Sequence, residues 1–449
     1  MNKILIKIYP LLPVIVQQYW KRIEESDIGS RIAKGAFWSL TGSIISQGLM
    51  LIASIVVARI LGKVEFGELG IIRSTVNMFA VFASFGLGLT ATKFIAEFKI
   101  RDKSKTGKII GITTLFAGGS GGIIAILIII AAPFLATTTL NSPHLVNEIR
   151  LSAIMLFFSA LIGAQTGTLA GFEAFKTIAK VNLVAGILAF PIQIGFTFWF
   201  GLSGSVIGFG LNFMILWVLN FIAVRKEARR LNVNIQFFKL KNELPLLYKF
   251  SLPALLSSAL VGPTMWICNT FLVNKPNGFE QMAIFDAANQ WRSAILFIPA
   301  ILAQITLPLL ADSLNDQNHF NKILKVNLII NFSFSFFIAT IISLFSGVIM
   351  RFYGENFVEG NVVLIILAFS TILISINNVI GQAMAGKSKI WIGFFLNLIW
   401  SIILIITSLI FINLGWGAKG LALGLLISYI VHTLTQSIFV YKYLYIKSN

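Results

Sequence analysis

Residues 282–300 read MAIFDAANQWRSAILFIPA, a largely apolar stretch that nevertheless holds Asp286, Asn289, Gln290 and Arg292. A helix that spans a membrane needs about 20 mainly apolar residues, and this stretch is long enough to enter a bilayer. Ionisable side chains at membrane depth are costly, so they usually face the interior of a helix bundle or a water-filled cavity. The stretch therefore predicts a membrane helix whose polar side chains point into the protein.

The whole chain has the composition of an integral membrane protein. Of its 449 residues, 57% are hydrophobic and 12% are charged, with a mean hydropathy of +0.87. Soluble domains carry about 25% charged residues. Charge is too scarce here to cover a soluble globule, so we expect an all-α integral membrane protein.

Twelve stretches of the sequence are long and apolar enough to be spanning helices. They cover roughly residues 37–60, 68–95, 109–135, 150–172, 181–200, 204–223, 250–273, 282–310, 324–350, 361–385, 390–412 and 417–441. Turn-like or charged stretches such as LGKVEFGE (61–68) separate them.

The 35 lysines and arginines are unevenly distributed among the connections between these spans. They gather in the N-terminal tail and in every second connection, such as 99–108 and 224–249, and are sparse in the others. Connections rich in lysine and arginine stay in the cytoplasm, which places both termini there. The net charge of +18 is thus explained by topology and by attraction to anionic membrane lipids, and we expect no nucleic-acid partner.

The two halves of the chain align with each other at an offset near 215 residues, which pairs Gly171 with Gly386 and Asn182 with Asn397. Each half holds six spans, and an even number gives both halves the same orientation, related by a pseudo-two-fold axis along the membrane normal. We therefore expect two six-helix lobes. The predicted organisation is a cytoplasmic or interfacial N-terminal segment (1–36), an N-lobe (37–223), a basic cytoplasmic linker (224–249), a C-lobe (250–441) and a cytoplasmic tail (442–449).

Polar residues form stripes on four of the predicted spans. Arg73, Asn77 and Ser84 lie on one narrow face of the second span, and the polar residues of 282–300 form a similar stripe on the eighth. The first and seventh spans add further cavity-lining candidates, namely Ser39, Ser43, Gln47, Ser258 and Asn269. Because these helices correspond in pairs in the two halves, their polar faces are best accommodated around one central aqueous cavity.

The charged residues of these stripes have two interpretations. Asp286 could form an intramembrane salt bridge with Arg73 or Arg292 that only orients the helices. Alternatively, the two arginines supply paired donors to a phosphate or carboxylate group. Asp286 would then be a counter-ion, or a site for a coupling H⁺ or Na⁺ that is released when substrate binds.

Few residues are available for a cofactor, a metal or covalent catalysis. The chain has a single cysteine, Cys268, and its histidines, His144, His319 and His432, are far apart without ligand spacing. The exterior connections are too short for a catalytic domain. We therefore expect no metal, no cofactor other than a coupling H⁺ or Na⁺, and no enzymatic activity.

Residues 31–72, RIAKGAFWSLTGSIISQGLMLIASIVVARILGKVEFGELGII, resemble the opening of the polysaccharide biosynthesis protein family. The matching elements include the A-R-x-L-G-x-x-x-F-G turn (58–67) and the S-x-G-L-G-x-x-x-T-K-like segment (84–93), and YKFSLPALLSS (248–258) resembles the start of the second half. These proteins are lipid-linked oligosaccharide flippases of a superfamily that includes multidrug and toxin exporters. The resemblance implies a V-shaped bundle of two lobes with a cationic cavity lined by the first, second, seventh and eighth helices.

The function implied is the transfer of an undecaprenyl-diphosphate-linked oligosaccharide from the cytoplasmic to the outer leaflet of a bacterial cytoplasmic (inner) membrane by alternating access. Arg73 and Arg292 would hold the diphosphate, and Asn77, Asn289 and Gln290 would hydrogen-bond sugar hydroxyls. The implied partners are this glycan lipid, membrane lipids and other polysaccharide assembly proteins.

Two other functions stay open for a chain of this kind. One is a cation-coupled multidrug or toxin extrusion antiporter of the same fold, although interior arginines and scarce acids favour an anionic substrate. The other is a scaffold for glycan assembly that transports nothing.

Overall fold

The structure is a computed structural model that describes residues 27–238, 240–246, 250–252, 255, 259–312, 316–386 and 390–440. Every regular element in these residues is a helix. The longer helices are α3 (Asp27–Ser84), α4 (Leu87–Phe98), α5 (Lys103–Phe134), α6 (Val146–Gly171), α7 (Phe175–Arg230), α10 (Val261–Val273), α11 (Gly278–Asp312), α12 (Gln317–Leu344), α13 (Ser346–Tyr353), α14 (Asn361–Gly386), α15 (Ile390–Asn413) and α16 (Gly417–Val440). The short elements are η2 (Leu135–Thr139), η3 (Pro143–Leu145), η4 (Lys241–Glu243), α8 (Leu244–Leu246) and η6 (Glu355–Gly360).

Two of these helices are hairpins rather than straight rods. A straight 58-residue helix such as α3 would be about 87 Å long, against a hydrocarbon thickness of about 30 Å. Both α3 and α7 have a non-helical glycine near the middle, Gly62 (φ 72°) and Gly201 (φ 56°). In α7, Thr197 and Ser205 lie on opposite sides of this glycine, and their hydroxyl oxygens are 2.7 Å apart. The chain thus reverses at Gly201, and we assign the same reversal to Gly62.

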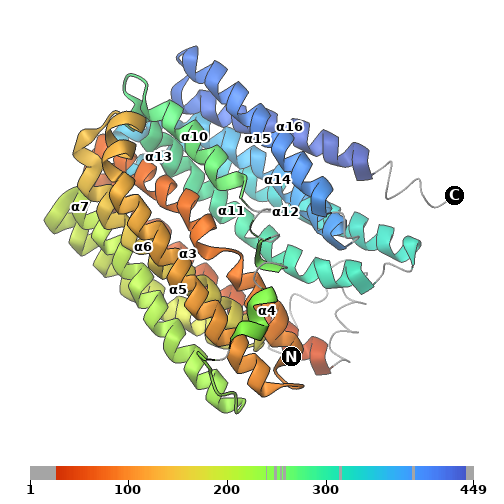
Figure 1. The fold of residues 1–449 in the computed structure, drawn as a ribbon. Helices are drawn as coiled ribbons and strands as arrows, with labels where there is room; N and C mark the ends of the chain where they lie inside the picture. The colour runs from red at the N-terminus through yellow and green to blue at the C-terminus, as the bar shows by residue number, and fades with distance from the viewer. Residues whose placement is uncertain are drawn as a thin grey trace.

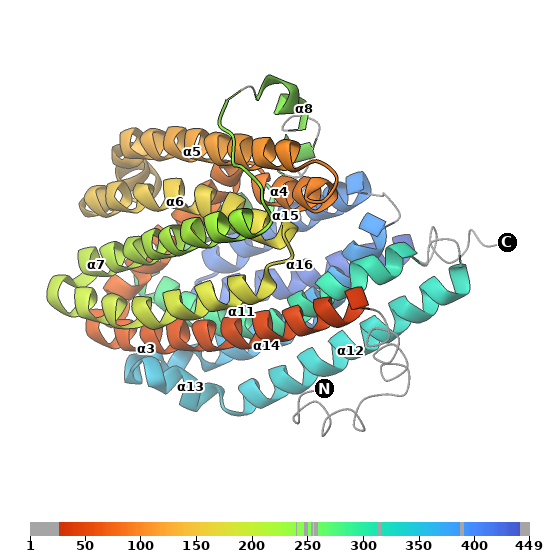
Figure 2. The ribbon, with the colours of Figure 1, turned by 90° about the horizontal axis from the view of Figure 1, so that it is seen from below.

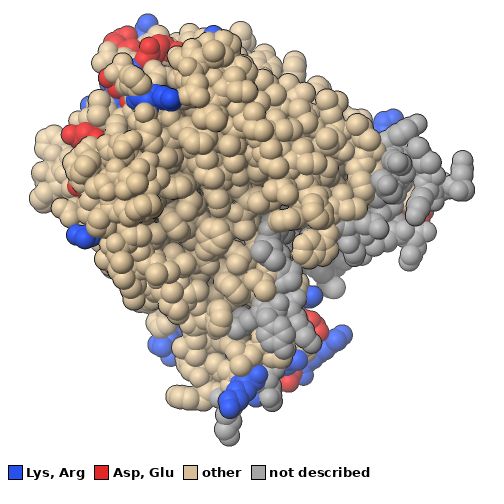
Figure 3. Space-filling model, turned by 45° about the horizontal axis from the view of Figure 1, so that its top comes forward, with Lys and Arg blue, Asp and Glu red and all other residues tan. Residues whose placement is uncertain are grey.

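Within the described residues, eight helical segments are long and apolar enough to cross a membrane. Two of them, Ile44–Ser84 and Phe175–Arg230, contain the two reversals, so each accounts for two passes. The helices α10 and α11 lie where the seventh and eighth spans were predicted. The prediction of an all-α bundle of about twelve membrane helices is confirmed. On the face drawn in Figure 3, charged side chains gather toward the two ends of the bundle and leave a broad uncharged belt between them.

The helices divide into two groups, α3–α7 in the N-lobe and α10–α16 in the C-lobe. Figure 1 shows α5–α7 on one side, α14–α16 on the other, and α3 and α11 between them; Figure 2 shows that most helices share one direction. Left-handed backbone positions recur at corresponding places in the two lobes. They pair Gly62 with Asn277, Asn141 with Gly354 and Gly201 with Gly415. These spacings agree with the internal repeat and the two-lobe arrangement expected from the sequence.

The prediction of one continuous helix over 68–95 was wrong. The chain turns at Phe85 (φ 47°) and Gly86 (φ 65°), so that α3 ends at Ser84 and α4 begins at Leu87. Past this turn α4 packs closely on α6, because Gly88 and Gly167 have no side chains to hold the two backbones apart. Hydropathy alone does not reveal the break, since both pieces are apolar.

The segment that joins the lobes is attached to the N-lobe. The predicted linker starts as helix, since α7 continues to Arg230, and the Gln236 N–H then donates to Gly107 O at 3.2 Å. A side chain at Gly107 or Gly111 would overlap the carbonyl oxygens of this segment. Further along, the Ser251 hydroxyl lies 2.6 Å from that of Thr90 on α4.

Candidate functional site

A cavity of about 530 Å³ lies between the lobes, lined by both arms of α3, by α10 and α11, and by Phe209 of α7. It brings together eight residues that the polar stripes predicted. They are Gln47, Arg73, Asn77, Asn269, Asp286, Asn289, Gln290 and Arg292. The side chains of Ser39 and Ser43, and the whole of Ser258, lie outside the described part of the chain. The functional roles of all these residues stay predictions.

Ser84 is a correction to the predicted lining. It does not contribute to this cavity; its hydroxyl donates to Val81 O at 2.9 Å. Ser84 is the last residue of α3 before the turn at Phe85 and Gly86. The stripe that starts at Arg73 therefore leaves the cavity wall before it reaches Ser84.

Arg73 links the two walls of the cavity. Its Nη1 lies 3.6 Å from Asp286 Oδ2, which joins the N-lobe to the C-lobe. The Phe209 ring covers the guanidinium, with 5.1 Å between Cζ and the ring centroid. Its Nε is buried and has no hydrogen-bond partner among the described residues. Arg73 lines the cavity and retains one unused donor, which is buried in this arrangement.

Asp286 is held from its own helix as well as from the opposite wall. The Gln290 Nε2 donates to Asp286 Oδ2 at 3.0 Å. Gly70 lies opposite, and a Cβ added there would be only 3.3 Å from the Asp286 Cβ. The absence of a side chain at Gly70 lets the two walls approach closely enough for the ion pair to form.

Arg292 has different partners from Arg73. Its Nε donates to Asn289 Oδ1 at 2.7 Å, and the Tyr429 hydroxyl of α16 lies close enough to interact with it electrostatically. No carboxylate pairs with Arg292 among the described residues. Tyr429 was missed at the sequence level, because a single tyrosine in an apolar span has no spacing that distinguishes a cavity contact from ordinary packing.

The cavity carries a net positive charge. Of the described residues that line it, Arg73, Arg292 and Asp286 are the charged ones. The other polar groups on the wall are neutral amides and hydroxyls. Two guanidinium groups against one carboxylate favour an anionic ligand over a cationic one.

The lobes are in direct contact at the end of the bundle near Gly62. The Gly67 backbone lies against Phe279, and a side chain at Gly67 would overlap the Phe279 carbonyl. Phe66 packs on Tyr353 and Phe357 of the C-lobe, with ring centroids 6.2 and 6.0 Å away. These contacts close this end of the cavity.

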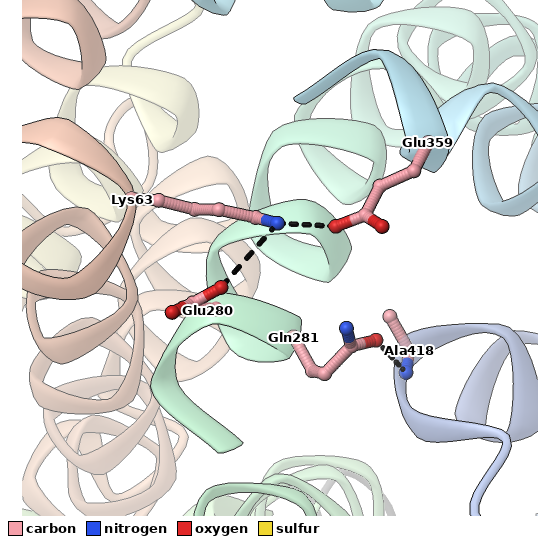
Figure 4. A network of polar contacts seen from close by, with 5 residues as sticks. All are labelled: Lys63, Glu280, Gln281, Glu359 and Ala418. Carbon is pink, nitrogen blue, oxygen red and sulfur yellow. Dashed lines mark hydrogen bonds and ion pairs between the residues drawn. The ribbon is translucent and has the colours of Figure 1, made fainter. Parts of the chain in front are cut away.

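Polar contacts reinforce the same closed end, as Figure 4 shows. Lys63 of α3 reaches across to Glu280 of α11, at 3.6 Å, and also forms an ion pair with Glu359 of η6. Within the C-lobe, the Ala418 N–H donates to Gln281 Oε1 at 2.9 Å, which joins α16 to α11. Lys63 therefore bridges one lobe to two elements of the other.

At the opposite end the described residues leave the cavity open. Gln47, Asn77, Ser293 and Ala294 line it and are exposed. The walls therefore separate progressively from Gly67 toward the end of the bundle where α3 begins and α16 ends. The arrangement is a V whose closed end lies near Gly62.

We expect replacement of Lys63 by alanine to loosen the closed end modestly. Its partners Glu280 and Glu359 are substantially exposed, at 40% and 58% of their side-chain area, and exposed ion pairs contribute about 0–1 kcal/mol. The population in which this end has parted should rise by up to roughly fivefold. Spin labels at Thr137 and Leu414, both exposed near this end, would report the change as a longer distance distribution.

Arg351→Ala is a matched control for this experiment. Arg351 pairs with Glu355 in the same lobe and at the same end, 3.4 Å away. It should leave the distances between the lobes unchanged. Equal distributions for Lys63→Ala and the unmodified protein would show that Lys63 does not hold the lobes together.

Comparisons with known proteins agree with this fold. The chain matches the family described as "Polysaccharide biosynthesis protein" over residues 32–314. It is 22% identical over 409 residues to the EPS I polysaccharide export inner membrane protein EpsE of Ralstonia nicotianae, covering 89% of this chain and 91% of that protein. It is also 22% identical to an uncharacterized membrane protein of Methanocaldococcus jannaschii, covering 88% and 95% of the two chains.

Solved structures of transporters share the architecture. An inward-facing multidrug resistance MATE family transporter of the MOP superfamily has a TM-score of 0.74 at 15% identity, covering 91% of this chain and 98% of that one. An outward-facing structure of such a transporter has a TM-score of 0.67 at 16% identity, covering 92% and 95%. At these identities the likeness shows the fold alone. The family match spans more than half of the sequence, and the chain therefore belongs to the polysaccharide biosynthesis protein family.

Proposed function

We propose that this protein is a flippase that moves an undecaprenyl-diphosphate-linked oligosaccharide from the cytoplasmic to the outer leaflet of a bacterial inner membrane. The observation that carries the proposal is the net positive cavity, which has one arginine on each lobe. The name of the Ralstonia relative, a polysaccharide export inner membrane protein, supports the same class of cargo.

The geometry suggests how such a cargo would be held. Arg73 and Arg292 would bind the diphosphate from opposite walls, because guanidinium groups match phosphate oxygens with paired donors. Asn77, Asn289 and Gln290 would donate to and accept from sugar hydroxyls beside them. The cavity volume of about 530 Å³ lies in the range of about 300–1,000 Å³ for small-molecule sites, which suits a diphosphate with its first sugars. The lipid tail would stay in the bilayer.

The direction of transport follows from the predicted topology. With both termini in the cytoplasm, the open end of the cavity faces the cytoplasm and the end near Gly62 faces outward. Alternating access would then require the closed end to part and the open end to close. Moving one negative charge outward across an inside-negative membrane gains about 2.3 kcal/mol per 100 mV, so the potential favours export of a diphosphate. Asp286 would be the site for an added H⁺ or Na⁺ coupling.

Reconstitution tests this function directly. Proteoliposomes would contain an undecaprenyl-diphosphate-linked oligosaccharide with a fluorescent sugar, and a membrane-impermeant quencher would report the outer leaflet. We expect the quenchable fraction to rise from about half toward completeness when the protein is present, because flipping exchanges the two leaflets. If the quenchable fraction stays at the protein-free value while cationic dyes are transported, the protein is a multidrug antiporter instead.

A further inference from the structure

The two arginines of the cavity are not equivalent. Arg73 is paired with the carboxylate of Asp286, whereas the described partners of Arg292 are the neutral groups of Asn289 and Tyr429. The positive charge of Arg292 is therefore available to a ligand, while that of Arg73 is already partly neutralised. The cavity therefore has two arginines that could bind an anion, and one of them, Arg73, already contacts the carboxylate of Asp286.

The ion pair between Arg73 and Asp286 is loose. Its 3.6 Å separation exceeds the roughly 2.7–2.9 Å of a charge-assisted hydrogen bond between nitrogen and oxygen. The same oxygen of Asp286 also accepts from Gln290 Nε2 at 3.0 Å. Because Gln290 lies one turn away on the same helix, it can keep this bond when Arg73 moves away. Separation of the pair would thus leave the carboxylate with a hydrogen-bond partner.

Arg73 is prepared to exchange this carboxylate for another anion. The Arg73 Cζ lies over the Phe209 ring, 5.1 Å from its centroid, and this contact supports the cation without using any of its N–H donors. Its Nε has no partner in the described part of the chain, in contrast to the Arg292 Nε, which Asn289 occupies. Once Arg73 turns away from Asp286, phosphate oxygens could accept from Nε and from Nη2, the two nitrogens that share one edge of the guanidinium.

From these contacts we propose that Asp286 is a tethered competitor that occupies Arg73 until the phosphate groups of the substrate displace it. The inference rests on the proposed function and adds how cargo is sensed. Asp286 belongs to the C-lobe and Arg73 to the N-lobe, so the pair ties the two walls together. Displacement replaces this direct tie with an anion held between Arg73 and Arg292. Arrival of the headgroup therefore changes how the lobes are joined.

Binding of inorganic pyrophosphate to the purified full-length protein tests the competition. We expect Asp286→Asn, which keeps the shape and the bond to Gln290, to tighten pyrophosphate binding by roughly tenfold, because a competitor that occupies a site most of the time lowers the apparent affinity by the free fraction. The control Glu173→Gln removes a carboxylate that pairs with Lys99 outside the cavity, and it should leave the affinity unchanged. Thermal unfolding of each variant verifies that it is folded.

The same substitution made in an Arg73→Ala protein separates competition for Arg73 from simple repulsion of the anion by Asp286. If Asp286 acts through Arg73, the tightening by Asp286→Asn should vanish in an Arg73→Ala protein. Tightening that persists there would mean that Asp286 only repels anions, and the inference would be wrong. If the unmodified protein binds pyrophosphate and Asp286→Asn binds it no more tightly, the inference is also wrong, while the proposed function stays intact. Absence of pyrophosphate binding in both proteins would count against the proposed function itself.

Discussion

Replacing Arg292 with alanine is expected to reduce flipping of the lipid-linked oligosaccharide by at least roughly 30-fold, because loss of a desolvated charged contact costs about 2–5 kcal/mol. Arg292 should matter more than Arg73, since it is the arginine whose charge no described carboxylate offsets. Arg292→Lys should restore part of the activity, because lysine keeps the charge but cannot form paired hydrogen bonds. The measurement is the initial flipping rate in proteoliposomes with equal amounts of folded protein.

Arg230→Ala is the control for this experiment. Arg230 lies at the end of α7, pairs with Glu227 on the same helix and does not line the cavity. Its flipping rate should match that of the unmodified protein. Unchanged rates in both Arg73→Ala and Arg292→Ala would contradict the role of the cavity arginines in binding the diphosphate.

The second large effect is expected at Gly67, where the lobes touch through their backbones. A Cβ at this position would overlap the Phe279 carbonyl oxygen, and over-packing of a tight contact costs about 1–3 kcal/mol even when side chains can shift. In Gly67→Leu the lobes would be forced apart at this end, so the state described here should become a minor population. Flipping should also slow, because alternating access requires this end of the cavity to close while the other end opens.

Cysteine cross-linking between the lobes measures this directly. Asn141 and Asn274 lie on different lobes near the same end, with their side-chain amides hydrogen-bonded at 2.8 Å. Cysteines at these two positions should cross-link readily in the unmodified protein and poorly in Gly67→Leu. Gly119→Leu is the matched control, since a Cβ at Gly119 meets open space. Equal cross-linking in the two glycine variants would show that the approach at Gly67 is not required for closure.

The helices and the polar stripes were predictable from the sequence because both depend on short-range patterns. A run of about 20 apolar residues identifies a span wherever it occurs. Helical periodicity likewise places Arg73 and Asn77 on one face, and does the same for Asp286, Asn289 and Arg292. Symmetry between the halves then suggested that these faces share one cavity, and the structure places these residues there.

What could not be predicted depends on how the lobes are oriented relative to each other. The sequence allowed Asp286 to pair with either arginine, and the choice of Arg73 follows from the close approach of α11 to Gly70. Tyr429 reaches Arg292 from α16, a helix whose buried polar residues Ser428, His432 and Gln436 do not line the cavity. The turn at Phe85 and Gly86 does not interrupt the hydropathy of the span, because most residues on both sides of it are apolar. Which end of the cavity is closed also depends on contacts between distant segments, such as Phe66 with Tyr353.

The most direct test of the central claim is photo-cross-linking from inside the cavity in living cells. A photoreactive phenylalanine at Asn77, which lines the cavity and is exposed to it, should capture the lipid-linked oligosaccharide as a covalent adduct. The same residue at Phe337, which is 63% exposed on α12 and does not line the cavity, should give only background. Equal glycan adducts at both positions, or none at Asn77 in a protein that flips the lipid, would contradict passage of the headgroup through this cavity.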